Sequence, residues 1–294
     1  MDRASRPCRS VLYIPGSKDR ALDKARGLPA DAIIFDLEDA VAPEEKPAAR
    51  ALLARVLADY DFGPRMRIVR INGFDTDWGR ADAAAMSTAI AGGAKIDAIL
   101  VPKVNHAADL DAVADLVPGA DLWAMMETAA GMLNAAGIAA HPRLKGMVMG
   151  TNDLAKELGS RFRADRLALV TGLGLCVLAA RAAGKVIVDG VFNAFKDDEG
   201  LRAECEQGRD MGFDGKTLIH PAQLAIANEV FAPSEAEIAL ARRQIEAFAA
   251  AKAAGQGVAV VDGRIVENLH VVTAEATLAK ALAIAQLEIA SVGV

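Results

Sequence analysis

Aromatic residues are scarce in this sequence: they account for 4% of its 294 residues, whereas the hydrophobic fraction is 53%. A core of this composition has to be built from Ala, Val, Leu and Ile, which is typical of a parallel sheet buried on both faces. No stretch approaches the roughly 18 uninterrupted apolar residues of a membrane span. No apolar segment of a signal peptide follows the basic N-terminal residues. These absences favour a globular protein of the cytoplasm that has no membrane partner.

Cysteines and histidines are too few and too scattered to indicate a metal site of their own. The cysteines are Cys8, Cys176 and Cys205, and none has the spacing of metal ligands. The net charge of −6 and the lack of a basic stripe argue against nucleic acid as a partner. Neither a Gly-x-Ser-x-Gly element nor a Walker loop is present, which disfavours a serine hydrolase and a P-loop nucleotide enzyme.

Short apolar runs bounded by turn or charged residues recur along the chain. The eight runs are Val11–Pro15, Ala32–Asp36, Arg67–Ile71, Ala98–Pro102, Leu122–Met126, Gly146–Met149, Lys185–Val188 and Lys216–Ile219. Stretches of helical composition separate most of them, and Glu44–Asp59 shows clear 3.6-residue periodicity. Strands that alternate with helices form parallel βαβ units, and eight units are the count of a closed barrel. The sequence therefore predicts an α/β fold, a (β/α)₈ TIM barrel.

We expect the barrel to occupy residues 1–232 and a small C-terminal extension to occupy residues 233–294. The extension is predicted to contain a helix over Glu235–Lys252, a hairpin of Val258–Val261 and Arg264–Val266 with an Asp262-Gly263 turn, and a helix over about Thr273–Ile289. A segment of this size is too small for an independent core. It should therefore pack on the barrel or on a neighbouring subunit.

Charged and polar residues cluster just after the predicted strands. Such exits are Asp36-Leu37-Glu38-Asp39, Arg70-Ile71-Asn72, Pro102-Lys103, Glu127-Thr128 and Thr151-Asn152-Asp153. The active site of a (β/α)₈ barrel is assembled at the carboxyl ends of its strands, so this asymmetry indicates a site there. Loop polarity and helix capping are the alternative explanation for any single residue.

Two carboxylates, Glu127 and Asp153, follow the fifth and sixth strands, which lie roughly 4.8 Å apart in a barrel. Because no histidine or cysteine cluster is nearby, this pair favours a hard cation such as Mg²⁺, which keeps water and substrate as its other ligands. Alternatively, each carboxylate caps the helix that follows it.

Arg70 leaves the third strand and points over the same barrel mouth. Its guanidinium can bind a carboxylate or a developing oxyanion, and it can also form an ion pair with the acidic run after the second strand. We expect Asp36 and Glu38 to point to opposite sides if that strand continues, so that at most part of the run faces the site. Cations around Arg20 and Lys24, beside the first strand, suit phosphate groups.

Taken together, these motifs resemble the citrate lyase β-subunit-like family, which includes malyl-CoA and citramalyl-CoA lyases and malyl-CoA thioesterases. The resemblance rests on Arg9–Gly16, Phe35–Val41 with Pro43, Glu45, Lys46 and Arg50, Val69–Asn72, Pro102-Lys103, Met126–Gly131, Gly215-Lys216 and His220-Pro221 with Gln223. These motifs occur in the order of the family and span essentially the whole chain.

The resemblance implies roles for six residues. Glu127 and Asp153 match the Mg²⁺ ligands of the family, and Arg70 matches the arginine that binds the keto acid and steadies the enolate. Arg20 and Lys24 match positions that contact coenzyme A phosphates. The C-terminal extension matches a lid that brings an acidic residue over a neighbouring subunit's barrel. That position holds Glu267 here instead of the usual aspartate, and Thr151-Asn152-Asp153 also departs from the family pattern.

The implied function is that of a Mg²⁺-dependent carbon–carbon lyase. It would cleave a 3-hydroxyacyl-CoA, such as malyl-CoA or citramalyl-CoA, into an acyl-CoA and a 2-keto acid, or form it from them. A malyl-CoA thioesterase with the same metal site is the first alternative, and a citrate lyase β subunit acting on an acyl-carrier thioester is the second. An inactive scaffold subunit is a third. The expected assembly is a homo-oligomer, a trimer or a hexamer.

Overall fold

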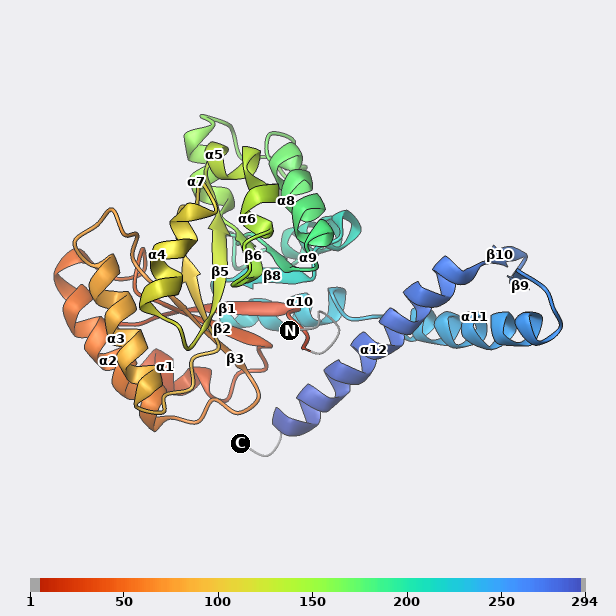
Figure 1. Cartoon of the computed structure of the whole chain (residues 1–294), viewed down its shortest axis with the longest axis horizontal. Coiled ribbons are helices and arrows are strands. Elements are labelled where there is room, and N and C mark those ends of the chain that lie inside the picture. Colours follow the sequence, from red (N-terminus) through yellow and green to blue (C-terminus); the bar gives the residue numbers. More distant parts are fainter. Residues whose placement is uncertain (1–5, 292–294) are drawn as a thin grey trace. The chain divides into compact units, whose positions relative to one another are not determined.

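Eight parallel strands close into a barrel in the computed structural model, which describes residues 6–291 (Figure 1). The strands are β1 (Ser10–Pro15), β2 (Ala32–Asp36), β3 (Met66–Arg70), β4 (Ala98–Val101), β5 (Asp121–Met126), β6 (Leu144–Met149), β7 (Val186–Asp189) and β8 (Gly215–Leu218). Each pairs with its neighbour in chain order, and β8 pairs with β1 to complete the ring. The predicted strands and the predicted (β/α)₈ fold are therefore confirmed.

Helices connect the strands and surround the barrel (Figure 1). They are α1 (Asp19–Ala25), α2 (Lys46–Asp59), α3 (Gly79–Ala91), α4 (Ala108–Leu116), α5 (Ala129–Leu133), α6 (Ala135–Ala139), α7 (Thr151–Glu157), α8 (Val170–Ala182), α9 (Asp198–Met211) and α10 (Leu224–Val230), with 3₁₀ turns η1 (Pro43–Glu45) and η2 (Pro221–Gln223). The predicted helix over Glu44–Asp59 is divided between η1 and α2, and Pro47 lies in the first turn of α2, where a missing N–H costs nothing. Among residues 6–291, no helix has the length and hydropathy to cross a membrane.

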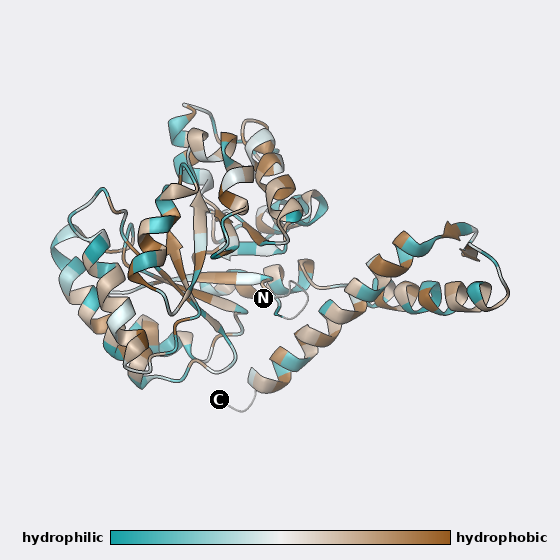
Figure 2. Ribbon diagram, in the orientation of Figure 1, coloured by the Kyte–Doolittle hydropathy of each residue, from teal (hydrophilic) through white to brown (hydrophobic). Residues whose placement is uncertain are grey.

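Strand side chains alternate between the barrel interior and the layer beneath the helices, because a strand has a period of two. Buried interior residues include Val11, Ala32, Ile34, Ile68, Leu100, Trp123, Met125, Val148 and Val188. The outer layer packs Leu12, Ile33, Phe35, Val69, Ile99, Leu122, Met147 and Ile187 against the helices. Figure 2 shows the barrel strands mainly in brown, the colour of hydrophobic residues. Both layers are built from aliphatic side chains, as the low aromatic content requires.

The largest interior side chain is Trp123, which is 1% exposed. It pairs in register with Gly146 of β6, and a Cβ atom on Gly146 would lie 2.4 Å from the indole ring. Only glycine leaves room for the indole at this point. Trp123 lies four residues before Glu127 on the same chain segment, so the ring fills the barrel beneath the carboxyl ends of the strands.

The described residues divide into two compact units, of which Cys8–Phe231 is the barrel. The second, which holds Arg6, Pro7 and the residues from Ala232 onward, contains α11 (Glu235–Ala253), β9 (Ala259–Val261), β10 (Arg264–Val266) and α12 (Asn268–Ser291). Its small buried cluster is Ala251, Ala259 and Val266.

The second unit contains the helices and the hairpin that the sequence predicts, and the largest difference is the start of the last helix. Ser234 caps α11 in a capping box with Glu237, and the hairpin turns through Asp262 (φ 51°) and Gly263 (φ 76°), the positive angles of a type I′ turn. The last helix begins at Asn268, earlier than the predicted Thr273, although Val271 and Val272 are poor helix formers. Packing against α11 overrides that local preference.

Candidate active site

Three charged residues occupy the inward-facing positions at the carboxyl ends of their strands. Asp36 ends β2, Arg70 ends β3, and Glu127 directly follows β5. Each lies two residues after an inward-facing apolar side chain, and Asp36 and Arg70 are partners in the β2–β3 register. All three are buried, with 1%, 6% and 1% of their surface exposed, respectively. The aliphatic barrel is therefore topped by a layer of buried charge.

Arg70 is held by three carboxylates. Its Nε and Nη2 donate to the two oxygens of Asp36 at 2.7 and 2.6 Å. Its Nη1 lies 3.0 Å from Glu38 Oε2 and donates to Asp39 Oδ2 at 3.1 Å. The guanidinium carbon also lies 5.1 Å from the centre of the Tyr13 ring. This confirms the ion pair that the sequence suggested, and it fixes the orientation of the guanidinium plane at the mouth.

The expectation that Asp36 and Glu38 would point to opposite sides is wrong, because both contact Arg70. Strand β2 ends at Asp36, whose carboxylate accepts hydrogen bonds from Glu38 N (2.9 Å) and Ala40 N (3.0 Å) and turns the chain back. Lys46 Nζ holds the same turn by donating to the carbonyls of Leu37 (3.0 Å) and Glu38 (2.7 Å). Residues two apart on a strand share a face, so even a continued strand would have placed Asp36 and Glu38 on the same side. The turn brings Glu38 Oε2 to 3.0 Å from Arg70 Nη1.

Glu127 is enclosed by backbone. Lys103 N donates to its Oε1 at 2.8 Å, with Lys103 at a φ of 50°. A Cβ atom on Gly150 would lie 2.4 Å from Glu127 Cβ and 2.6 Å from Oε2, so glycine permits this close approach. Burial raises the pKa of the Glu127 carboxyl to about 8, and repulsion from Glu38 adds to the rise. Burial likewise raises the pKa of Glu38 to about 7, against the attraction of Arg70.

Helix capping does not account for the two predicted metal ligands. Thr128, not Glu127, caps α5, because its hydroxyl accepts a hydrogen bond from Gly131 N at 3.0 Å. Gly150 is the N-cap residue of α7, and Asp153 lies inside the first turn of that helix. Asp153 is partly exposed and lines the cavity at the mouth. Both carboxylates therefore remain available for a ligand.

The charge balance and the donor set fit a hard divalent cation. The mouth holds five carboxylates against three cations; the acids are Asp36, Glu38, Asp39, Glu127 and Asp153, and the bases are Lys46, Arg70 and Lys103. Glu38 Oε2 is buried, and its contact is the ion pair with Arg70 Nη1 at 3.0 Å. In residues 6–291 no group of three or more His, Cys, Asp or Glu forms a complete ligand cage. Glu127 and Asp153 would thus supply two ligands, and solvent or substrate would supply the others, as Mg²⁺ prefers.

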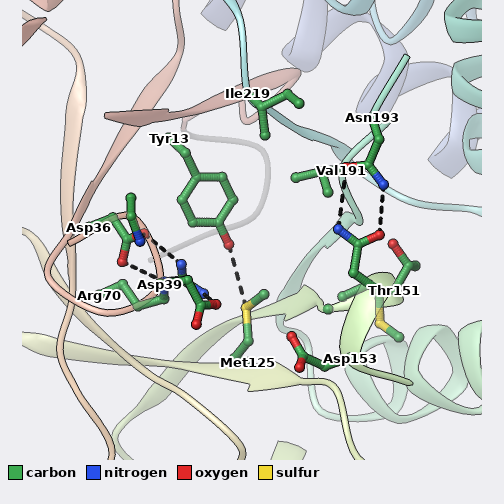
Figure 3. Close-up of a pocket in the computed structure, with 14 residues that line it drawn as sticks. Tyr13, Asp36, Asp39, Arg70, Met125, Thr151, Asp153, Val191, Asn193 and Ile219 are labelled. Carbon is green, nitrogen blue, oxygen red and sulfur yellow. Dashed lines mark hydrogen bonds and ion pairs between the residues drawn. The ribbon is translucent and has the colours of Figure 1, made fainter. Parts of the chain in front are cut away.

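A cavity of about 290 Å³ opens at this mouth, with Tyr13, Arg70 and Asp153 around it (Figure 3). Met125, Met149, Val191 and Ile219 provide apolar walls, and Asn152 and Asn193 provide amides. The Tyr13 hydroxyl contacts Met125 Sδ at 3.6 Å. Burial raises the pKa of Tyr13 well above its usual range, so the phenol stays a neutral donor. Sequence reasoning missed Tyr13 and Asn193, which no spacing pattern marks.

Of the six predicted residues, Arg70 and Asp153 line this cavity, and Glu127 is buried beside the lining residue Gly150 without lining it. The other three predicted residues are exposed and are not lining residues. Arg20 and Lys24 are exposed on α1, and neither lines the cavity. Glu267 is exposed between β10 and α12 of the second unit, where its backbone N–H donates to His270 Nδ1 at 3.0 Å. Their roles at the site stay predictions.

The family follows from comparison with known proteins. A family model described as HpcH/HpaI aldolase/citrate lyase matches residues 9–221. The chain belongs to this family. The resemblance inferred from the motifs is confirmed, and the protein is an enzyme of the citrate lyase β type.

Relatives of this family member cover nearly its full length. It is 73% identical over 285 residues to the (3S)-malyl-CoA thioesterase of Cereibacter sphaeroides, with 97% of this chain and 98% of that protein covered. It is 35% identical to the L-malyl-CoA/beta-methylmalyl-CoA lyase of the same species, over 94% and 95% of the two chains. Among solved structures, CitE from Mycobacterium tuberculosis in complex with magnesium, acetoacetate and coenzyme A matches with a TM-score of 0.77 and 32% identity, covering 95% of this chain and 99% of that one.

A second buried charge cluster lies between β7, β8 and the helices outside them. Asp189 is 0% exposed and accepts hydrogen bonds from Arg166 Nη1 at 2.8 and 2.7 Å. Lys216 Nζ lies 3.3 Å from Asp189 Oδ2 and 2.6 Å from Glu204 Oε1. Asp189 is therefore the shared counter-charge of two buried cations.

The Asp189→Asn variant should lose about 3–5 kcal/mol of unfolding free energy at pH 7, because Arg166 and Lys216 are left without their shared partner. Burial alone would raise the pKa of the Asp189 carboxyl, but Lys216 and Arg166 hold that pKa below its usual range. A carboxyl of this kind contributes its full stability above its unfolded pKa of about 3.9 and loses it as the pH falls through the lower folded pKa. Urea unfolding at several pH values measures the difference.

The difference between wild type and variant should be constant above about pH 5 and shrink below about pH 4. The control is Glu229→Gln in the exposed Arg202–Glu229 pair (2.7 Å), which should change stability little. A difference that persists undiminished in strong acid would show that Asp189 acts through its shape alone.

Proposed function

We propose that the protein is a Mg²⁺-dependent thioesterase that hydrolyses a coenzyme A thioester of the malyl-CoA type. The observation that carries this proposal is the 73% identity to a (3S)-malyl-CoA thioesterase along nearly the whole of both chains, against 35% to a malyl-CoA lyase. The sequence motifs alone had placed carbon–carbon cleavage first and hydrolysis second. The comparisons favour the reverse order.

In this proposal, different residues at the mouth bind the metal ion and stabilise negative charge on the substrate. Glu127 and Asp153 would hold Mg²⁺, which when bound would polarise oxygen atoms of the acid portion of the substrate. Arg70, held by Asp36 and Glu38, would stabilise a carboxylate or a developing oxyanion. The neutral Tyr13 hydroxyl offers a further donor to the same cavity. Hydrolysis then adds water to the thioester carbonyl and releases free coenzyme A.

Three further residues belong to the proposal on the strength of the family resemblance. Arg20 and Lys24, exposed on α1, would contact coenzyme A phosphates. Glu267 would reach the barrel mouth of a neighbouring subunit in a homo-oligomer and transfer the proton. In hydrolysis it would take a proton from water, and in carbon–carbon cleavage it would give one to the enolate carbon.

Carbon–carbon cleavage is the second candidate, favoured by the lyase relative and by the CitE complex with magnesium, acetoacetate and coenzyme A. Both reactions use the same metal ligands and the same arginine, so the mouth geometry suits either. The citrate lyase reaction on an acyl-carrier thioester is a variant of this candidate.

Product analysis separates the candidates. Incubation with Mg²⁺ and (3S)-malyl-CoA should yield free coenzyme A and malate, which mass spectrometry resolves. Acetyl-CoA and glyoxylate as the first products would instead establish a lyase, and no turnover of any hydroxyacyl-CoA would reject both candidates. Glyoxylate should be added in a parallel reaction with acetyl-CoA to detect the reverse condensation.

Glu127→Gln and Asp153→Asn should each weaken Mg²⁺ binding by about tenfold or more, because each removes a charged ligand and little volume. Calorimetric titration of Mg²⁺ measures the affinity directly, and the thermal midpoint reports the fold. Glu44→Gln, which alters an exposed carboxylate in η1, is the control and should bind as wild type does. Wild-type affinity in both site variants would remove these residues from the metal site.

The lid proposal predicts complementation between two inactive variants. Arg70→Lys keeps the charge among the acids but loses the planar fork, and Glu267→Ala loses the lid carboxylate. Mixed under conditions of subunit exchange, the two should recover about a quarter of wild-type activity, because random pairing joins an intact barrel to an intact lid in that share of sites. Exchange proven by differently tagged subunits, without recovery, would mean that the lid serves its own barrel.

A further inference from the structure

A second cavity, of about 460 Å³, lies beside the active-site cavity, over the carboxyl ends of β6 and β7. The two cavities share Thr151, Asn152, Val191 and Asn193 as lining residues. The Asn152 and Asn193 amides hydrogen-bond to each other in both directions, at 3.3 and 2.8 Å (Figure 3). The two hydrogen-bonded amides therefore line both cavities and form part of the boundary between them.

The second cavity is lined by Arg166, which is 5% exposed. Its Nη1 is engaged by Asp189 and its Nε donates to Gln207 Oε1 at 2.7 Å, but its Nη2 is buried without a hydrogen-bond partner. The residue also has a φ of 51°, a left-handed conformation that is costly for a side-chain-bearing residue. Leaving a buried guanidinium N–H without an acceptor costs free energy, so a group that accepts a hydrogen bond from Nη2 would be stabilising.

The other lining residues indicate which kind of hydrogen-bond acceptor would fit this cavity. Arg161 adds an exposed cation, whereas Arg163 is already engaged by Asp165 at 2.7 Å. The one lining carboxylate, Glu204, is occupied by Lys216 at 2.6 Å. Much of the remaining wall is apolar and consists of Ala155, Phe162, Ala164, Ala168, Leu169, Val191, Phe192 and Ala194. An acceptor with an aliphatic body satisfies both features, whereas a bare inorganic anion would leave the apolar wall uncovered.

We propose that this cavity binds a small aliphatic carboxylic acid. Its carboxylate would take up the unpartnered Nη2 of Arg166 with help from Arg161, and its carbon chain would cover Ala168 and Leu169. The site is separate from the cations of α1, which follow β1. It stands independently of the proposed thioesterase activity, because none of its argument uses the metal or the reaction.

Calorimetric titration of the metal-free protein with sodium butyrate tests the proposal, with inorganic phosphate as the comparison anion. Ala168→Phe fills the cavity from an exposed position and should weaken butyrate binding by at least about tenfold. Ala84→Phe, at an exposed position of α3, is the matched control and should bind as wild type does. Arg166→Lys removes the free nitrogen while keeping a cation for Asp189, and should weaken binding similarly; its thermal midpoint shows whether the fold is kept.

The Arg70→Lys variant distinguishes this cavity from the active-site cavity. Unchanged butyrate binding in Arg70→Lys, together with its loss in Ala168→Phe, would support the proposal. Loss in Arg70→Lys with retention in Ala168→Phe would place the acid in the active-site cavity and overturn it. Failure of wild type to bind butyrate, or binding of phosphate with equal affinity, would overturn it as well.

Discussion

The two-pronged ion pair between Arg70 and Asp36 is the interaction on which the barrel mouth depends. It joins the ends of β2 and β3, and the same Asp36 carboxylate accepts the backbone N–H groups that turn the chain after β2. Without Arg70, the buried acids Glu38 and Glu127 would face each other with less compensating charge, and ionising both would be more costly. The arginine thus allows carboxylates to be concentrated at the mouth, where the proposed cation and acidic substrate would bind.

Much of this arrangement is readable from sequence, because it follows from strand periodicity. Asp36, Arg70 and Glu127 each fall on the inward parity of a recognisable apolar run, and the barrel brings such positions together. The prediction for Glu38 failed because residues two apart on a strand share a face, so periodicity never placed Asp36 and Glu38 on opposite sides. The turn held by Lys46 then sets how Glu38 meets Arg70, which periodicity does not encode. The capping alternative for Glu127 needed the structure to assign that role to Thr128.

The features that sequence reasoning missed have no periodic signal. Tyr13 reads as one more apolar position of β1, and the Asn152–Asn193 pair joins the first turn of α7 to a loop 41 positions further along the chain. The left-handed backbone of Arg166 is likewise invisible to any periodic pattern. Hydrolysis and carbon–carbon cleavage could not be ordered from the motifs because both reactions use the same metal ligands and arginine. Similarity along the whole chain is what favours hydrolysis in the proposal.

The indole of Trp123, seated against Gly146, has a consequence for how molecules reach the catalytic layer. The indole fills the barrel interior below the mouth. Water and a thioester substrate would therefore both reach the catalytic layer through the mouth. A hydrolase built on this barrel has no back entrance for its nucleophile. A segment that covered the mouth would then control the access of water. Tight closure would slow hydrolysis, which needs water as a reactant, and would not slow carbon–carbon cleavage, which does not. On such a scaffold, the choice between the two chemistries belongs to the cover rather than to the barrel.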